Sequence, residues 1–153
     1  MKSCMIDGST ARYELKDFEG HVYYCQPGMA SSFDVQLLEP ETEFTGQSFD
    51  MGRVEISELG DQVFVCGYPD KLGDKPTIST GHISKLNAEY KNNSGLIQFS
   101  SAAVNRKNSG GPVTDYNGNV VGVLVMRTES GEKTLNVAFA EPLERALKEL
   151  GIG

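Results

Sequence analysis

Residues 101–115 read Ser-Ala-Ala-Val-Asn-Arg-Lys-Asn-Ser-Gly-Gly-Pro-Val-Thr-Asp. The serine at position 109 is followed by two glycines, which give the backbone access to positive φ and allow another segment to approach closely. Pro112 then fixes its own φ and removes an N–H donor, so this stretch is incompatible with a regular helix. We expect a tight turn that exposes the Ser109 side chain at its apex. A Ser-Gly-Gly run also occurs in linkers and plain hairpin turns, so the flanking sequence has to decide its meaning.

Around this turn the chain alternates apolar and polar residues in short runs separated by turn residues, which is typical of β-strands. Helical spacing occurs at 142–150, with Pro142 suited to the first turn and Gly151 to the end. We expect Gln26-Pro27-Gly28 to end the second strand. Many short strands with one terminal helix predict an all-β protein of barrel type. The predicted strands are 11–15, 21–25, 33–38, 62–67, 77–84, 95–100, 112–115, 119–127 and 134–139.

Size and charge restrict the partners of this chain. Its 153 residues favour a single domain with its own hydrophobic core. It carries 21 acidic and 14 basic side chains, a net charge of −7, and no basic cluster. Because phosphate neutralisation supplies most non-specific affinity for nucleic acids, we predict no nucleic-acid partner. No apolar run approaches the roughly 20 residues that span a bilayer, and the N-terminus lacks the apolar core of a signal peptide, so we predict no membrane partner.

The cysteines argue against a disulfide framework and against a metal site. Cys4, Cys25 and Cys66 are odd in number, and no Cys-x-x-Cys pair occurs. Cys25 and Cys66 lie in alternating apolar runs, where a free thiol is usually a small core residue. Unpaired thiols suit a reducing compartment, which favours the cytoplasm as the location.

Four stretches occur in the order found in a known family. Asn-Ser-Gly-Gly-Pro at 108–112, after Ser-Ala-Ala-Val-Asn-Arg, resembles the nucleophile loop of the trypsin-like serine proteases and, more closely, of their Deg/HtrA branch. Residues 63–69, Val-Phe-Val-Cys-Gly-Tyr-Pro, are similar to a strand of that branch that ends in Gly-x-Pro. Residues 78–84 are similar to its Thr-x-Gly-x-Ile-Ser strand, and residues 136–142 to its last strand, which leads into a C-terminal helix.

The resemblance implies a trypsin-like double β-barrel with an incomplete first barrel and a C-terminal helix. The whole chain, 1–153, would be a single trypsin-like peptidase domain. Residues 1–45 would be the remnant of the first barrel and 46–61 the connection. Residues 62–140 would form the second barrel and 141–151 the helix.

The resemblance also assigns the residues of a catalytic site. Ser109 would be the nucleophile. Asp34, in Ser-Ser-Phe-Asp-Val-Gln-Leu-Leu, is similar to the aspartate that orients the catalytic imidazole; the alternative is a strand-start aspartate that caps a turn. The N–H groups of Ser109 and Lys107 would form the oxyanion hole. The family has glycine at the position of Lys107, so the side chain makes the required backbone orientation costlier.

A pocket for the substrate residue before the scissile bond is implied beside Ser109. Ala103 would lie at its floor, and its wall would be formed by Leu124, Val125 and Met126. Because no aspartate occupies the floor, we expect a preference for a small or medium apolar side chain. The same residues also suit ordinary barrel core, and the two interpretations are compatible.

The general base is the missing part of this site, since a serine hydroxyl needs an adjacent imidazole to take its proton. The chain contains His21 and His82, and we interpret both as solvated strand histidines. Alignment on Asp34 puts the family's histidine at or just before the N-terminus, near Ser3-Cys4-Met5. We therefore expect a serine endopeptidase domain that is inactive or incomplete as given.

Two other functions stay open at this point. A non-catalytic pseudoprotease could hold a peptide strand on an exposed sheet edge. A small β-barrel with an unknown ligand is the third interpretation. The expected partner is a peptide or protein substrate. An open strand edge would be covered by a second copy of the chain or by refolded N-terminal residues. No cofactor is implied, because acyl transfer by serine needs none.

Overall fold

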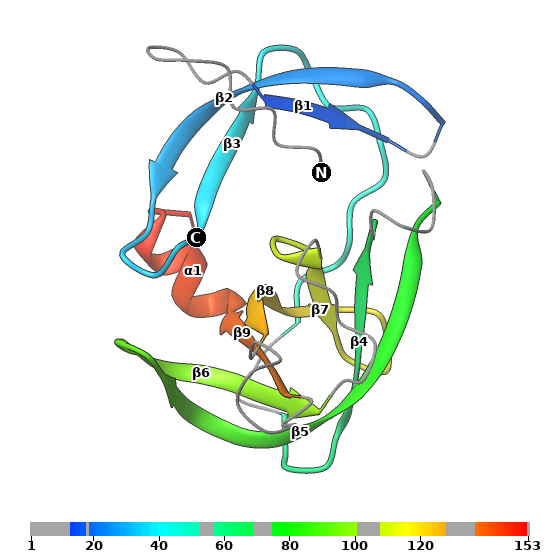
Figure 1. The fold of residues 1–153 in the computed structure, drawn as a ribbon. Coiled ribbons are helices and arrows are strands. Elements are labelled where there is room, and N and C mark those ends of the chain that lie inside the picture. Colours follow the sequence, from blue (N-terminus) through cyan, green and yellow to red (C-terminus); the bar gives the residue numbers. More distant parts are fainter. Residues whose placement is uncertain are drawn as a thin grey trace.

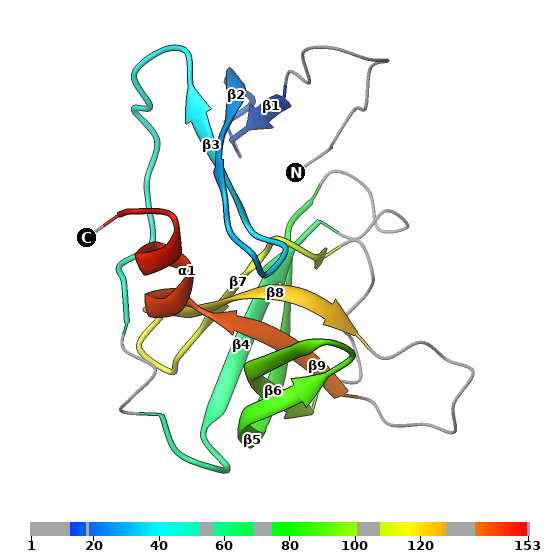
Figure 2. The same cartoon turned by 90° about the vertical axis from the view of Figure 1, so that its left-hand side faces the viewer.

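The part of the chain that the structure describes forms two antiparallel β-structures and one short helix (Figures 1 and 2). The computed structural model describes residues 13–17, 19–52, 57–68, 75–100, 108–127 and 137–152. A three-stranded sheet has the order β1-β2-β3, and a closed barrel has the order β4-β5-β6-β9-β8-β7. The all-β class with a C-terminal helix is thereby confirmed. The sheet strands are β1 (Tyr13–Lys16), β2 (Val22–Ala30) and β3 (Gln36–Pro40). The barrel strands are β4 (Gln62–Gly67), β5 (Thr77–Tyr90), β6 (Asn93–Ser100), β7 (Pro112–Thr114), β8 (Val120–Arg127) and β9 (Val137–Pro142), and the helix is α1 (Leu143–Glu149).

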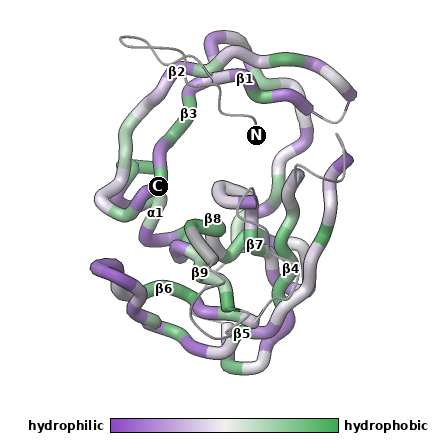
Figure 3. The backbone as a smooth tube through the Cα atoms, viewed as in Figure 1, coloured by the Kyte–Doolittle hydropathy of each residue, from purple (hydrophilic) through white to green (hydrophobic). Residues whose placement is uncertain are grey.

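The hydrophobic core lies inside the barrel, because alternate residues of each strand point inward. Polar and apolar positions accordingly follow one another along these strands (Figure 3). Phe99 on β6 is 0% exposed, and burial of such a side chain stabilises a fold by about 1.5–3 kcal/mol. The fully or almost fully buried members of this core are Val63, Val65, Ile83, Ile97, Phe99, Val113, Val121, Leu124, Ala138 and Ala140.

The two largest errors in the predicted strand ends, at residues 25 and 84, are both explained by irregular pairing. β2 does not stop at Gln26-Pro27-Gly28 but continues to Ala30, and its pairing with β3 shifts between Pro27 and Ala30. Such an irregularity tolerates a proline that donates no hydrogen bond. β5 continues past residue 84 to Tyr90, with further shifts in its pairing with β6.

The helix and the third strand also begin later than the sequence indicated. Pro142 precedes α1 as its N-cap, with an extended ψ of 130°, and does not lie in the first turn. β3 begins at Gln36, because residues 31–35 form a turn in which Ser31 accepts and donates hydrogen bonds. We call residues 31–35 the β2–β3 turn.

The β2–β3 turn and α1 lie where the sheet meets the barrel. The sheet stands on one side of the barrel, and α1 lies between the barrel and the ends of β2 and β3 (Figure 1). α1 packs on β8 and β9. The chain that leads from the sheet to the barrel is tied to β8, since Val120 and residues 50–52 exchange backbone hydrogen bonds. Among the described residues, no helix is long and apolar enough to cross a membrane.

Candidate active site

Ser109 lies exposed in a tight turn, as the sequence indicated. We call residues 108–111 the serine turn; it leads directly into β7. Gly110 has a φ of +86° and donates its N–H to the Leu124 carbonyl oxygen at 2.7 Å. Leu124 in turn donates its N–H to the Gly111 carbonyl oxygen at 2.9 Å. The serine turn is therefore fixed to β8 by two backbone hydrogen bonds, one made by the carbonyl oxygen of Leu124 and one by its N–H group.

Gly111 brings the serine turn against the end of β4. A Cβ at this position would lie 2.3 Å from the Cys66 carbonyl oxygen and 2.8 Å from that of Asn108. Both neighbours are backbone atoms, which cannot move aside as a flexible side chain can. Only glycine fits here, so the second glycine of the motif is required by close packing.

Asn108 precedes the nucleophile candidate and is 2% exposed. Its side chain packs against Gly67, where an added Cβ would lie 2.7 Å from Oδ1. Neither Oδ1 nor Nδ2 of Asn108 has a hydrogen-bond partner. A buried amide without partners costs free energy, and such groups are rare in folded proteins.

Asp34 lies exposed in the β2–β3 turn with a φ of +67°. Aspartate tolerates this left-handed region better than most residues. The turn is capped by Ser31, whose Oγ accepts the N–H groups of Phe33 and Val35 at 3.2 Å. Ser31 also donates its own N–H to the Val35 carbonyl oxygen at 2.7 Å. Ser31 therefore caps this turn, in which Asp34 is exposed.

The two histidines lie away from both turns of the candidate site. His21 is 63% exposed between β1 and β2, with its Nδ1 2.9 Å from Asp17 Oδ2 and 3.6 Å from Glu19 Oε2. The hydrogen bond with Asp17 raises the pKa of His21 above its ordinary value. His82 is exposed on β5, where its N–H lies 3.3 Å from Ser100 Oγ. Neither imidazole contacts Ser109 or Asp34.

Asp17, Glu19 and His21 are also the one group of potential metal ligands in the described ranges, with ligand atoms within 4.8 Å of one another. The hydrogen bonds inside this group account for its geometry. Asp17 is partly buried, whereas Glu19 and His21 are exposed. Three ligands on a hairpin turn are fewer than the four of a structural zinc site, and we assign no metal to them.

The predicted pocket residues are described only in part. Leu124 and Val125 have buried side chains in the two apolar clusters of the barrel. These two side chains therefore belong to the barrel core, which is compatible with a role in a pocket wall. The positions of Ala103 and Lys107, and the side chain of Met126, lie outside the described residues, as do residues 1–12.

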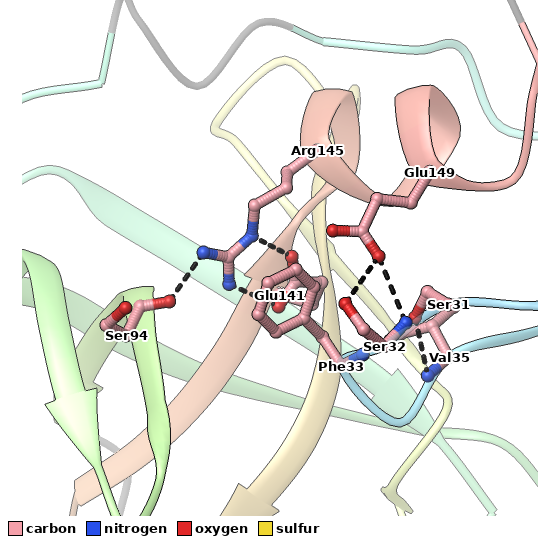
Figure 4. A network of polar contacts seen from close by, with 8 residues as sticks. All are labelled: Ser31, Ser32, Phe33, Val35, Ser94, Glu141, Arg145 and Glu149. Carbon is pink, nitrogen blue, oxygen red and sulfur yellow. Dashed lines mark hydrogen bonds and ion pairs between the residues drawn. The ribbon is translucent and has the colours of Figure 1, made fainter.

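A polar network that the sequence reasoning missed joins the β2–β3 turn to the barrel (Figure 4). In this network Ser32 is hydrogen-bonded to Glu149 of α1, and the ring of Phe33 stacks on Arg145 of α1. Arg145 is also paired with Glu141. On the helix expected at 141–151, the four-residue spacing of Glu141 and Arg145 is a recognisable signal for an ion pair, although Glu141 lies in β9. Nothing in the local sequence indicates the contacts with residues 32 and 33, which are more than a hundred positions away.

The fold and the two turns define a class of protein. A three-stranded antiparallel sheet, a closed antiparallel barrel and a serine in a glycine turn before a barrel strand are those of the trypsin-like peptidases. Residues 7–123 match the family model described as trypsin-like peptidase domain. The chain belongs to this family, and its relatives place it in the Deg/HtrA branch.

Two curated relatives share the name probable periplasmic serine endoprotease DegP-like. The protein from Bartonella henselae is 36% identical over 115 residues, which cover 74% of this chain and 22% of that protein. The protein from Buchnera aphidicola is 30% identical over 119 residues, which cover 76% of this chain and 25% of that protein. The chain thus spans about a quarter of the length of these relatives.

A similar solved structure is the HtrA-type protease AlgW with decapeptide. It superposes with a TM-score of 0.79 at 23% sequence identity, and the match covers 92% of this chain and 43% of that chain. At this identity the likeness supports the fold.

Proposed function

We propose that this chain is the trypsin-like domain of a serine endopeptidase. Ser109 is the nucleophile, and Asp34 is the carboxylate that orients the general-base imidazole. The observation that carries the proposal is the serine turn, which exposes Ser109 while β8 and the end of β4 hold its backbone. The names of the relatives, which are serine endoproteases, support the same activity.

The proposed reaction is acyl transfer in two steps. Ser109 Oγ forms a bond to the scissile carbonyl carbon, while an imidazole takes the hydroxyl proton and passes it to the departing amine. Water then cleaves the resulting ester and restores the hydroxyl. The N–H groups of Ser109 and Lys107 would stabilise the oxyanion in both steps; removal of one such donor typically costs about 3–4 kcal/mol.

The general base decides whether this chain is active by itself. His21 is engaged with Asp17, and His82 lies on the outside of β5. With no imidazole beside Ser109, we expect negligible hydrolysis of ordinary peptides and no labelling by a fluorophosphonate. Stoichiometric labelling of Ser109 would contradict this and would show that an imidazole, with His21 the first candidate, reaches the serine.

A substrate that carries its own imidazole tests the proposal directly. Two peptides would share an apolar residue before the scissile bond and would differ in the preceding residue, histidine in one and glutamine in the other. We expect the chain to cleave the histidine peptide alone, Ser109→Ala to abolish the cleavage and Asp34→Asn to slow it. Absence of cleavage of the histidine peptide would contradict the catalytic assignment.

A second candidate function is peptide binding without chemistry. It is favoured by the lack of any hydrogen bond between Ser109, Asp34 and either histidine in the described structure. The solved structure of AlgW, 43% of which matches this fold, is one with a decapeptide. β1 and β3 are the edges of the three-stranded sheet, where a peptide or a second copy of the chain could add a strand. Saturable binding of both test peptides without cleavage is the result that this function predicts.

The names of two relatives and the free thiols of this chain point to different cellular locations. The relatives from Bartonella and Buchnera are named periplasmic, whereas the free thiols of Cys25 and Cys66 favoured the cytoplasm. The cytoplasmic location therefore stays a prediction.

A further inference from the structure

We propose that Arg145 is a positioning residue, which holds the β2–β3 turn, and with it Asp34, in a fixed place relative to the serine turn. The inference rests on the proposed function in one respect, the role of Asp34. The contacts that support it are independent of that role.

The first step is the burial of a charge at the end of β9. Glu141 is 0% exposed, so its carboxylate requires a partner. Arg145, four residues further along the chain, is this partner. It donates hydrogen bonds to the Glu141 carboxylate through both Nε and Nη2, and the Nη2–Oε2 distance is 2.6 Å. This is the bidentate geometry that the planar guanidinium group favours. The hydrogen bonds to Glu141 raise the pKa of Arg145 further, so the guanidinium stays charged.

The second step fixes the far end of the same side chain. Arg145 Nη1 donates a hydrogen bond to the Ser94 carbonyl oxygen at the start of β6. Gly95 has a φ of +75°, and a Cβ there would lie 2.3 Å from Nη1. The guanidinium is therefore confined between β6 and β9, both of which belong to the closed barrel.

The third step brings the β2–β3 turn onto this fixed group. The Arg145 guanidinium carbon lies 4.1 Å from the centre of the Phe33 ring, which is stacking distance for a cation on an aromatic face. Glu149, four residues further along α1, accepts hydrogen bonds from the N–H and Oγ of Ser32 at 3.0 and 2.9 Å. The two residues before Asp34 are thus held by two residues on one face of α1 (Figure 4).

The fourth step connects this arrangement to Ser109. The serine turn is hydrogen-bonded to Leu124 of β8, and Leu124 pairs with Ala140 of β9. Ala140 directly precedes Glu141, which holds Arg145. A continuous series of backbone pairs, the Glu141–Arg145 ion pair and the cation–π contact of Arg145 with Phe33 therefore runs from the serine turn to the β2–β3 turn. The neighbouring elements are strands and a helix, which makes the connection stiff.

Hydrogen exchange measured by NMR tests whether Arg145 holds the turn. The amides of Phe33 and Val35, which are bonded to Ser31 Oγ, report on opening of the turn. We expect roughly tenfold faster exchange at both amides in Arg145→Lys, which loses the planar stacking face. Lys148→Met is the matched control, because Lys148 is an exposed basic residue of the same helix, and it should leave these amides unchanged.

Two further variants keep the test decisive. Arg145→Leu alone would leave Glu141 buried without a partner and can prevent folding, so it is combined with Glu141→Leu. Phe33→Leu removes the aromatic face from the other side, and Phe33→Tyr keeps it. We expect faster turn exchange in the double variant and in Phe33→Leu, and normal exchange in Phe33→Tyr. Unchanged exchange in a folded double variant would overturn the proposal.

Cleavage of the histidine peptide tests what the positioning does. If Arg145 places Asp34, Arg145→Lys and Phe33→Leu should lower kcat by about 10- to 100-fold with KM unchanged, and Phe33→Tyr should retain kcat. Loosening of the turn with an unchanged kcat would reduce Arg145 to a structural residue and overturn the proposal. If the chain itself fails to cleave this peptide, the proposed function is wrong, and the exchange rates alone decide whether Arg145 fixes the turn.

Discussion

The guanidinium carbon of Arg145 lies 4.1 Å from the centre of the Phe33 ring. This contact joins the helix at the C-terminal end of the chain to the turn that carries Asp34. It is the aromatic part of an arrangement whose charged part is the buried Glu141. Because Arg145 also donates a hydrogen bond to the start of β6, one side chain touches the β2–β3 turn and two strands of the barrel. The boundary between the two halves is thus a specific contact, and not only an apolar surface.

The serine turn should be sensitive to a single methyl group at position 111. Gly111→Ala places a Cβ 2.3 Å from the Cys66 carbonyl oxygen, so we expect a loss of about 1–3 kcal/mol in the free energy of unfolding. Gly118→Ala is the control, since its φ is +85° but no atom lies within 4 Å of the added Cβ. That variant should lose only about 1 kcal/mol. Urea unfolding measures both, and equal losses would contradict the close packing at Gly111.

Because the Asn108 amide is buried without a hydrogen-bond partner, we expect its removal and its replacement by a carboxylate to have different consequences for stability. Asn108→Ala removes two buried polar atoms that have no partner, so stability should change by less than about 1 kcal/mol or rise. Asn108→Asp buries a charge in the same place and should cost roughly 3–5 kcal/mol at neutral pH. Thermal and urea unfolding of the two variants provide the comparison. A strongly destabilised Asn108→Ala would show that the amide has a partner in solution.

The barrel core should depend strongly on Phe99. Phe99→Ala leaves a cavity at a position that is 0% exposed, so we expect a loss of about 3–5 kcal/mol. Ile78→Ala on the outside of β5, where the side chain is 69% exposed, should change stability by less than about 0.5 kcal/mol. Calorimetry under conditions of reversible unfolding measures both. Similar losses at the two positions would mean that the inward and outward faces are wrongly assigned.

The pair formed by His21 and Asp17 should give a small dependence of stability on pH. Since the hydrogen bond raises the pKa of His21, its stabilising effect is complete below the ordinary value of 6.5 and is lost as the pH rises through the raised value. An NMR titration of the His21 ring should show the raised pKa, and Asp17→Asn should return it toward 6.5. The unfolding temperatures of the unmodified protein and of Asp17→Asn should converge at pH values above the raised pKa of His21. An unshifted titration of His21 would refute the pairing.

Much of the fold could be predicted from local sequence. The strand at 62–67 has the predicted bounds, because a short apolar run lies between turn residues on both sides and its length is that of a strand. The terminal helix was found from its spacing, although Pro142 caps it from outside. Strand ends were predicted less well. Pro27 remains inside β2 because the pairing with β3 shifts there, and such a shift depends on a partner strand.

Local sequence likewise predicts one part of the candidate site and gives no signal for the other. The exposure of Ser109 follows from two glycines and a proline, whose backbone restrictions act within the serine turn itself. Leu124 was assigned to a pocket wall, yet its clearest contribution is the backbone hydrogen bonding that holds the serine turn. Arg145 and Glu149 gave no local signal of their contacts with Phe33 and Ser32, and the last of these pairs is 117 residues apart.

Local sequence is enough to predict the sharp turn at Ser109, the alternating strands and the terminal helix, because the φ restrictions of glycine and proline and the periodicity of apolar residues act over a few neighbouring positions. The resemblance of four motifs, in their order along the chain, indicates the trypsin-like family. The contact of Arg145 with Phe33, and the lack of contact between either histidine and Ser109, are set by the tertiary structure. Those relationships join residues from distant parts of the chain, and the order in which the strands close the barrel sets which of them meet.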